Sequence, residues 1–265
     1  MAGSRVSADH LRLAFVKAFK RDWGKIMIVY ILLFIAEAIF ASLFIKAGYP
    51  EATKKGFSFK MCAATVFVLN GIYAYFQGVK GAYAISIVIA LIFGFWGDLF
   101  LALNPFYKNR ENEKKLSTFF VLLGGVFFLL EHVTYIVTFA KELKEKDAFD
   151  AFIFAGVLLA VLIIGIILTA VLKLKLGKFT VPIIIYALAI SSMLAMSVCL
   201  AVKASGNMKL QAILFIAPIL FVISDSTLVL KIFDKKRFDS MPVRIINLST
   251  YFLAQMLFGL SMLYI

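Results

Sequence analysis

Two aspartates carry the clearest chemical signal in this sequence, because each lies inside a run of apolar residues. Asp98 lies in "GFWGDLFLAL", residues 94–103, and Asp225 lies in "ISDSTLVLKIF", residues 223–233. An ionisable side chain at membrane depth is costly unless it is paired, neutralised or hydrated, so its presence is a functional hypothesis by default. Two carboxylates close together in a weakly hydrated interior favour protonation of one of them. Such a pair predicts acid/base chemistry, in which one group donates a proton and the other carries negative charge.

The two aspartates share a local pattern that suggests an internal repeat. A small residue, Asp, Leu, Leu and Phe recur at the same spacing in residues 97–106 and 224–233. Parallel repeats of this kind are related by an axis along the membrane normal, and binding sites commonly lie at the interface between repeats. The hypothesis is therefore a 4+4 parallel repeat in which Asp98 and Asp225 lie at one depth, unpaired, and face each other.

Further polar residues fall at helical spacing within apolar runs. One run contributes Glu37, others Asn70 with Tyr73, Glu131 with His132 and Tyr135, Tyr186 with Ser191 and Ser192, and Asn247 with Tyr251 and Gln255. Each has a structural alternative. Asparagine, glutamine and serine often form hydrogen bonds between helices, a glutamate can pair with a Lys near a helix end, and His132 can be a structural hydrogen-bonding group.

The composition identifies the elements that must position these residues. The chain has 265 residues, of which 63% are hydrophobic and 16% are charged, with 28 Phe. A soluble globule needs more polar residues to cover its surface, so the composition indicates an integral membrane protein. Eight apolar runs are long enough to cross a bilayer as helices, which predicts an all-α polytopic fold with eight transmembrane helices. The runs are at 26–46, 59–77, 82–103, 116–139, 149–172, 179–202, 210–233 and 243–264.

The chain divides into a basic N-terminal segment, residues 1–25, and a transmembrane domain, residues 26–265. The first segment holds six basic residues and lacks the apolar core of a cleavable signal peptide. Leu11, Phe15 and Phe19 suggest a short interfacial helix there. The orientation stays open, since 12 Lys and Arg lie on the side of the N-terminus and 16 on the other. The net charge of +13 suits contact with anionic lipids, or reflects ordinary basic loops.

Several familiar chemistries find no support in the sequence. It has two histidines, and only His132 lies in an apolar run, so a zinc site built on three histidines cannot form. No phosphate-binding loop, nucleophile elbow or nucleic-acid motif is present. Cys62 and Cys199 both lie in apolar runs, which predicts no disulfide framework. A metal site built on carboxylates alone stays open but has no support in the sequence. We therefore expect no metal, no cofactor and no nucleic-acid partner.

Five stretches in order resemble the YhhN-like lysoplasmalogenase family of eight-helix membrane proteins. They are "GDLFL", "GGVFFLLEHVTY", "IYALAISSMLAMSV", "ISDSTLVLKIF" and "STYFLAQMLFGLS", and they cover the third to the eighth run. The sequence departs from the family at Glu131, where a small residue usually precedes the His. It also departs after Lys60, which a Pro usually follows. These departures leave the substrate preference of this chain open.

The resemblance implies hydrolysis of the vinyl ether bond of lysoplasmalogens, which gives a fatty aldehyde and a glycerophospho headgroup. Asp98 and Asp225 would be the catalytic pair, with the choice of general acid open. The residues that would orient water or bind substrate are His132, Tyr135, Glu131, Tyr186, Tyr251 and Gln255. The expected partners are a lysophospholipid substrate and membrane lipids, and the oligomeric state is open. The expected location is the endoplasmic reticulum or another membrane of a eukaryotic cell, or a bacterial inner membrane.

Two other functions remain open at this point. In a proton- or cation-coupled transporter, Asp98, Asp225 and Glu131 would form a relay through the membrane. Pro or Gly breaks at matching positions in two helices would favour that function. A catalytically silent lipid-binding protein is the other alternative.

Overall fold

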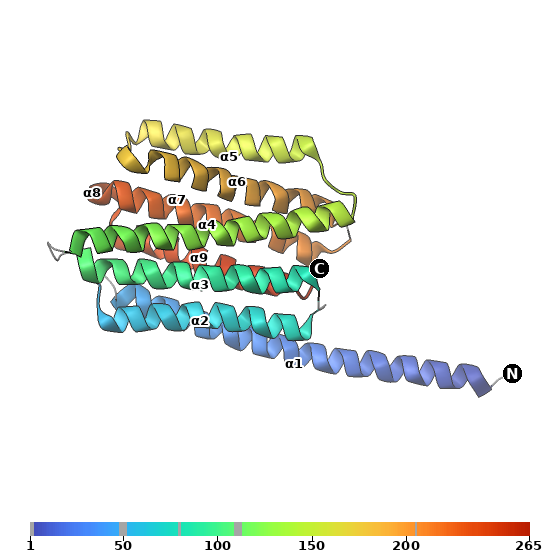
Figure 1. Ribbon diagram of the computed structural model, residues 1–265. Coiled ribbons are helices and arrows are strands. Elements are labelled where there is room, and N and C mark those ends of the chain that lie inside the picture. The colour runs from blue at the N-terminus through green and yellow to red at the C-terminus, as the bar shows by residue number, and fades with distance from the viewer. Residues whose placement is uncertain (1–2, 48–51, 79–80, 109–112, 205) are drawn as a thin grey trace.

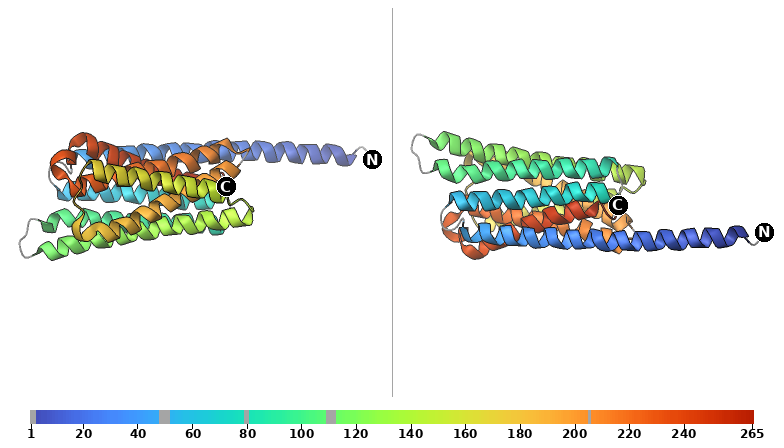
Figure 2. Two further views of the ribbon diagram at one scale, coloured as in Figure 1. Left: turned by 90° about the horizontal axis from the view of Figure 1, so that it is seen from above. Right: turned by 90° about the horizontal axis from the view of Figure 1, so that it is seen from below.

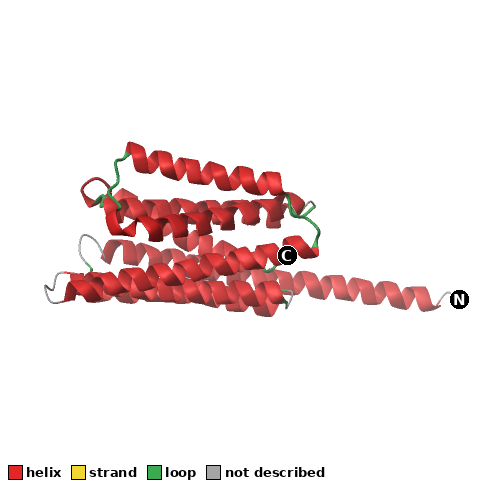
Figure 3. Ribbon diagram, turned by 45° about the horizontal axis from the view of Figure 1, so that its top comes forward, coloured by secondary structure: helices red, strands yellow, loops and turns green. Residues whose placement is uncertain are grey.

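The computed structural model describes residues 3–47, 52–78, 81–108, 113–204 and 206–265, with side chains from residue 23 onward except at positions 108, 114 and 178. Over these residues the chain is helical, with short connecting loops and no strand (Figure 3). The elements, labelled in Figure 1, are α1 (Gly3–Ala47), α2 (Lys54–Gln77), α3 (Ala82–Lys108), α4 (Lys114–Glu145), α5 (Ala151–Val171), the 3-10 turn η2 (Gly177–Phe179), α6 (Thr180–Lys203), α7 (Met208–Phe233), α8 (Lys235–Phe238) and α9 (Met241–Ser261).

The prediction of eight transmembrane helices is confirmed for the described residues. Eight helices are long and apolar enough to cross a membrane, from Trp23–Ala47 to Met241–Ser261. Several boundaries differ from the sequence prediction, and among them α2 begins at Lys54 and α3 continues to Lys108. The charged residues after position 139 continue α4 to Glu145, and the basic loop after α7 contains the short helix α8. Lys and Glu are good helix formers, so a helix need not end where its apolar run ends.

Polar side chains fix the points at which several helices begin. Thr53 accepts a hydrogen bond from the Gly56 backbone N–H at 2.9 Å at the start of α2. Asp150 accepts bonds from the first turn of α5, and Asn207 accepts one from Leu210 at the start of α7. Each cap satisfies backbone donors that have no partner within the helix.

The helices pack as a bundle in which α6 and α9 connect the two halves of the chain. α3 packs against α2 and α4, α9 packs against α7, α2 and α1, and α6 packs against α4, α5 and α7. α4 and α6 diverge toward the end of the bundle where α8 lies (Figure 1), and α7 packs against α6. α5 lies at the edge beside α6 and has no buried residue. The divergence of α4 and α6 leaves room for the pocket described below.

The N-terminal part of α1 extends well beyond the rest of the bundle (Figure 2). The predicted segment 1–25 continues without a break into the first membrane span, Trp23–Ala47, while residues 1–2 lie outside the described residues. Its placement on a membrane surface stays a prediction. The 4+4 repeat also stays a prediction, although α3 and α7 do run in the same direction (Figure 1).

Candidate active site

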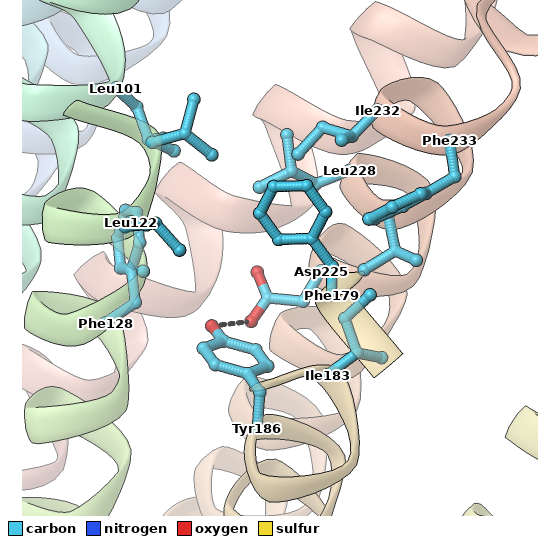
Figure 4. A pocket seen from close by; sticks show the side chains of 13 residues that line it. Leu101, Leu122, Phe128, Phe179, Ile183, Tyr186, Asp225, Leu228, Ile232 and Phe233 are labelled. Atoms are coloured by element: carbon cyan, nitrogen blue, oxygen red, sulfur yellow. Dashed lines mark hydrogen bonds between the residues drawn. The ribbon is translucent and has the colours of Figure 1, made fainter. Parts of the chain in front are cut away.

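A pocket of about 140 Å³ lies between the diverging helices, with one carboxylate in its wall (Figure 4). Its lining comes from α3, α4, η2, α6 and α7: Leu101, Val121, Leu122, Gly125, Phe128, Phe179, Ile183, Tyr186, Asp225, Leu228, Val229, Ile232 and Phe233. Only Tyr186 and Asp225 among these carry a polar side chain. The α7 residues from Asp225 to Phe233 span eight positions, or about 12 Å of helix. The pocket is therefore an apolar slot with its polar groups at the Asp225 end.

Asp225 is held by two side chains from other helices, both on the same oxygen. The Tyr186 hydroxyl donates to Asp225 Oδ2 at 2.6 Å, and His132 Nε2 lies 3.2 Å from that oxygen. His132 Nε2 also lies 2.9 Å from the Tyr186 hydroxyl, so the three groups form a triangle. The other oxygen of Asp225 points away from Tyr186 into the pocket (Figure 4). The carboxyl group can thus exchange a proton with the triangle and present its free oxygen to a bound molecule.

Packing fixes the His132 ring that supplies this contact. The ring lies edge-on to Phe221, with centroids 4.8 Å apart, and edge-on to Tyr186 at 5.2 Å. Its second nitrogen, Nδ1, is buried and has no hydrogen-bond partner among the described residues. His132 is fully buried, and its Nε2 is aimed at Asp225.

Asp98 has a different partner, Lys60 on α2. Lys60 Nζ lies 2.9 Å from Asp98 Oδ1 and also donates to the Asp98 backbone carbonyl at 3.2 Å. The two side chains are only 4% and 8% exposed, for Asp98 and Lys60 respectively. The expectation of two unpaired carboxylates is therefore wrong for both aspartates. Lys60 was missed as a site residue, although a lone cation inside the predicted span 59–77 was a signal that a buried anion faces it.

A hydrogen-bonded network of α4 and α9 side chains lies beside Asp98. The Gln255 amide donates through Nε2 to Glu131 Oε1 at 2.7 Å and to the Tyr251 hydroxyl at 3.0 Å. Tyr135 donates to Gln255 Oε1 at 3.3 Å and contacts Glu131 Oε1 at 3.5 Å. Tyr251 also lies near enough to Asp98 to interact with it electrostatically. Glu131 thus bonds with an amide and a phenol, and not with a Lys.

Glycines on α3 make this close packing feasible. A Cβ at Gly94 would lie 2.6 Å from Gln255 Nε2 and 2.9 Å from Glu131 Oε1, which is closer than real side chains approach. The absence of a side chain at Gly94 is therefore what lets Glu131 and Gln255 meet against α3.

The predicted site residues fall into two neighbouring groups. Asp225, His132 and Tyr186 form the pocket group, and Asp98, Glu131, Tyr135, Tyr251 and Gln255 form the inner group together with Lys60. Asp98, Glu131 and Asp225 are near enough to interact electrostatically. Among the described residues, no hydrogen bond joins Asp98 to Asp225 directly, and no set of three or more His, Cys, Asp or Glu side chains is arranged to hold a metal. Their catalytic roles stay predictions.

Other polar residues match the structural alternative or stand apart. Asn70 donates to the Met256 carbonyl at 3.0 Å, and Asn247 donates to the Ser224 carbonyl at 2.8 Å, so both bind one helix to another. Glu37 on α1 is buried, and neither of its carboxylate oxygens has a hydrogen-bond partner among the described residues.

Comparison with models of protein families matches residues 57–262 to the YhhN family. No curated protein matches the chain. No solved structure matches it either. The matched region contains both groups of site residues and begins just before Lys60.

Proposed function

Because the chain belongs to the YhhN family, we propose that it is a membrane hydrolase that cleaves the vinyl ether bond of lysoplasmalogens. The products would be a fatty aldehyde and glycerophosphocholine or glycerophosphoethanolamine. One observation carries the proposal: Asp225 presents a free oxygen to an apolar slot while Tyr186 and His132 hold its other oxygen. A lipid with one chain suits such a slot, and a carboxyl group at its end can donate a proton.

Asp225 is the general acid in this mechanism. Its carboxylic acid form donates a proton to the vinyl carbon that is not bonded to oxygen, and the double-bond electrons form the new C–H bond. The carbon bonded to oxygen becomes an oxocarbenium ion next to the newly formed Asp225 carboxylate. Low local polarity strengthens this attraction, because few water dipoles compete with it.

Water completes the reaction by adding to the oxocarbenium carbon. As the water oxygen forms its bond to carbon, one of its protons passes to the Asp225 carboxylate and restores the acid. The resulting hemiacetal collapses: its hydroxyl proton passes to the glycerol oxygen, the C–O bond to glycerol breaks, and aldehyde and alcohol leave. His132 and Tyr186 orient Asp225, and His132 is placed to accept or return a proton during these steps.

Asp98 has the anionic role. Lys60 Nζ lies 2.9 Å from Asp98 Oδ1, and a buried carboxylate needs such a cation beside it to carry negative charge. The Asp98 charge lies within electrostatic range of Asp225 and favours a cationic intermediate, although the Lys60 charge offsets part of this effect. Tyr251 interacts with this carboxylate. Gln255 holds Tyr251 in place and is itself bonded to Glu131 and Tyr135.

Aldehyde release by the purified protein in detergent micelles tests the proposal. The substrate is a lysoplasmalogen, and the control substrate is the saturated 1-alkyl lysophospholipid. Release from the vinyl ether alone, lost in Asp225→Asn, supports the assignment. Absence of aldehyde from folded wild-type protein, across several headgroups and chain lengths, would contradict it.

The transporter alternative has one observation in its favour, the hydrogen-bonded network that links Tyr251 to Glu131 near two further carboxylates. Prolines do not add to it. Pro105 comes seven residues after Asp98 in α3, whereas Pro218 comes seven before Asp225 in α7, so the two do not occupy matching positions. Dissipation of a pH gradient in proteoliposomes, abolished by Glu131→Gln, would support transport over hydrolysis.

A further inference from the structure

The rim of the pocket faces the lipid. Leu122 on α4 and Ile232 on α7 line the pocket and are 45% and 42% exposed. Leu122 lies within the span Lys115–Glu145, where the surroundings of an exposed side chain are lipid chains, and Ile232 lies at the end of the span Met208–Phe233. Because both residues line the pocket and are exposed, the pocket opens on the side of the bundle.

Gly125 on α4 leaves part of this pocket free. A Cβ at Gly125 would meet no atom within 4 Å, although the residue lines the pocket. The adjacent Gly124 is the opposite case, since a Cβ there would lie 2.9 Å from Leu101 Cγ. Helix packing therefore explains the glycine at position 124 and not the glycine at position 125. The missing side chain at Gly125 instead adds open volume to the slot.

We propose that the substrate enters sideways from the bilayer between α4 and α6, and that its single hydrocarbon chain lies over Gly125 with its polar end at Asp225. The identity of the substrate in this inference rests on the proposed function. The occupant is a hydrocarbon chain because the walls are apolar and the opening lies at membrane depth, where chains and not water are available. The polar end is at Asp225 because Tyr186 and Asp225 supply the polar side chains of the lining.

A second groove offers a rival position for a lipid chain. It measures about 300 Å³ and is lined by Met27, Tyr30, Ile31, Phe34, Ile35 and Ala38 of α1 with Leu260 of α9. Its lining includes no carboxylate, so a chain held there has no acid beside its reactive end. Labelling of this groove and of the slot can be told apart, because the two lie on different helices.

The test is photolabelling with a saturated 1-alkyl lysophosphocholine that carries a diazirine in its chain. This probe lacks the double bond, so its binding is measured without turnover. In nanodiscs, the wild-type protein should be labelled on peptides of α4, α6 and α7. Gly125→Phe should reduce that labelling about tenfold or more. Gly156→Phe on α5 is the matched control, since its Cβ also meets open space and Gly156 lies outside the pocket lining; it should label as the wild type does.

Each outcome supports or overturns the inference. Unchanged labelling in Gly125→Phe, or wild-type labelling concentrated on α1, overturns it. If Gly125→Phe elutes as unfolded protein, Gly125→Leu replaces it with a smaller obstruction and the same criterion. If Gly125→Phe loses labelling but the wild-type protein releases no aldehyde, the entry route is retained and the proposed function is removed. If Gly125→Phe still releases aldehyde and its KM and labelling match those of the wild type, the proposed function is retained and the entry route is overturned.

Discussion

The Tyr186 hydroxyl donates a 2.6 Å hydrogen bond to Asp225 Oδ2, the same oxygen that His132 Nε2 approaches at 3.2 Å. Two partners on one oxygen fix the plane of the carboxyl group and leave its other oxygen to face the pocket (Figure 4). The two aspartates differ in the chemistry of the partner, since a phenol and an imidazole hold Asp225 whereas the Lys60 ammonium group holds Asp98. Tyr186→Phe therefore tests the orientation of Asp225, and Asp225→Asn tests its role as proton donor.

Tyr186→Phe removes the orienting bond and keeps the aromatic ring. A hydrogen bond to a charged group contributes about 1.5–3 kcal/mol, so kcat should fall about 10- to 100-fold. The carboxyl group of Asp225 is still present in this variant, so residual aldehyde release should remain measurable. Initial rates at saturating lysoplasmalogen test this, and a variant as inactive as Asp225→Asn would assign Tyr186 a direct role in the chemistry.

Asp225→Asn removes the proton donor and keeps the shape of the side chain. Acid/base participation contributes about 10²- to 10⁴-fold, so turnover should fall by at least about two orders of magnitude. If Asp98 and Asp225 act as a unit, the double variant with Asp98→Asn should be little worse than either single variant. The measurement is aldehyde release at matched concentrations of folded protein. Near-normal turnover in either single variant removes that aspartate from the mechanism.

Lys60→Met leaves the Asp98 charge buried without its partner. Removing one member of a buried ion pair destabilises a protein by about 3–5 kcal/mol, so the melting temperature in detergent should fall. Lys60→Met combined with Asp98→Asn removes both charges and should recover most of that loss, while activity stays low. Thermal unfolding of the wild type, both single variants and the double variant gives the coupling energy. Additive effects would show that the 2.9 Å contact contributes nothing to stability.

Gly94→Ala places a methyl group where Gln255 and Glu131 meet against α3. The new Cβ would lie 2.6 Å from Gln255 Nε2, so the network must shift. Overpacking of this kind should lower the free energy of unfolding by about 1–3 kcal/mol. Turnover should also decrease, because the network beside Asp98 is displaced. Gly156→Ala on α5 is the control, because its Cβ meets open space, Gly156 lies outside the pocket lining, and alanine favours the helix. Equal stability of the two variants would contradict the packing described for Gly94.

Substrate selection tests the chemistry independently of mutations. A saturated 1-alkyl lysophospholipid should compete with lysoplasmalogen and release no product, because it has no double bond to protonate. Two-chain plasmalogens should be poor substrates if the slot accepts one chain. Comparable release of fatty acid from an ester-linked lysophospholipid would indicate a lysophospholipase instead.

The sequence was sufficient for the eight helices, because each follows from a long apolar run whose backbone must be hydrogen-bonded internally in lipid. It also identified Asp98, Asp225, His132 and Tyr186 as polar residues at membrane depth. It did not predict which of them meet. Tyr186 and Asp225 are 39 residues apart, and His132 and Asp225 are 93 apart, so their contacts depend on how α4, α6 and α7 cross.

The partner of Asp98 was closer to being predictable. Lys60 lies inside a predicted span and near the same end of the bundle as Asp98, and a lone cation in such a run calls for an anion. The pocket is a different case, because it results from the divergence of α4 and α6 and from the empty side-chain position at Gly125. Neither feature produces a periodic signal in the sequence.

α5 connects the pocket to the thickness of the surrounding bilayer. None of its residues is buried, and it packs against α6, so lipid surrounds most of its surface. Its 21 residues span about 31 Å, which matches a hydrocarbon layer of about 30 Å. A thinner or thicker membrane therefore favours a different tilt of α5. Because α5 packs against α6, whose first turns form one wall of the slot, we expect the thickness of the bilayer to affect the width of the entrance.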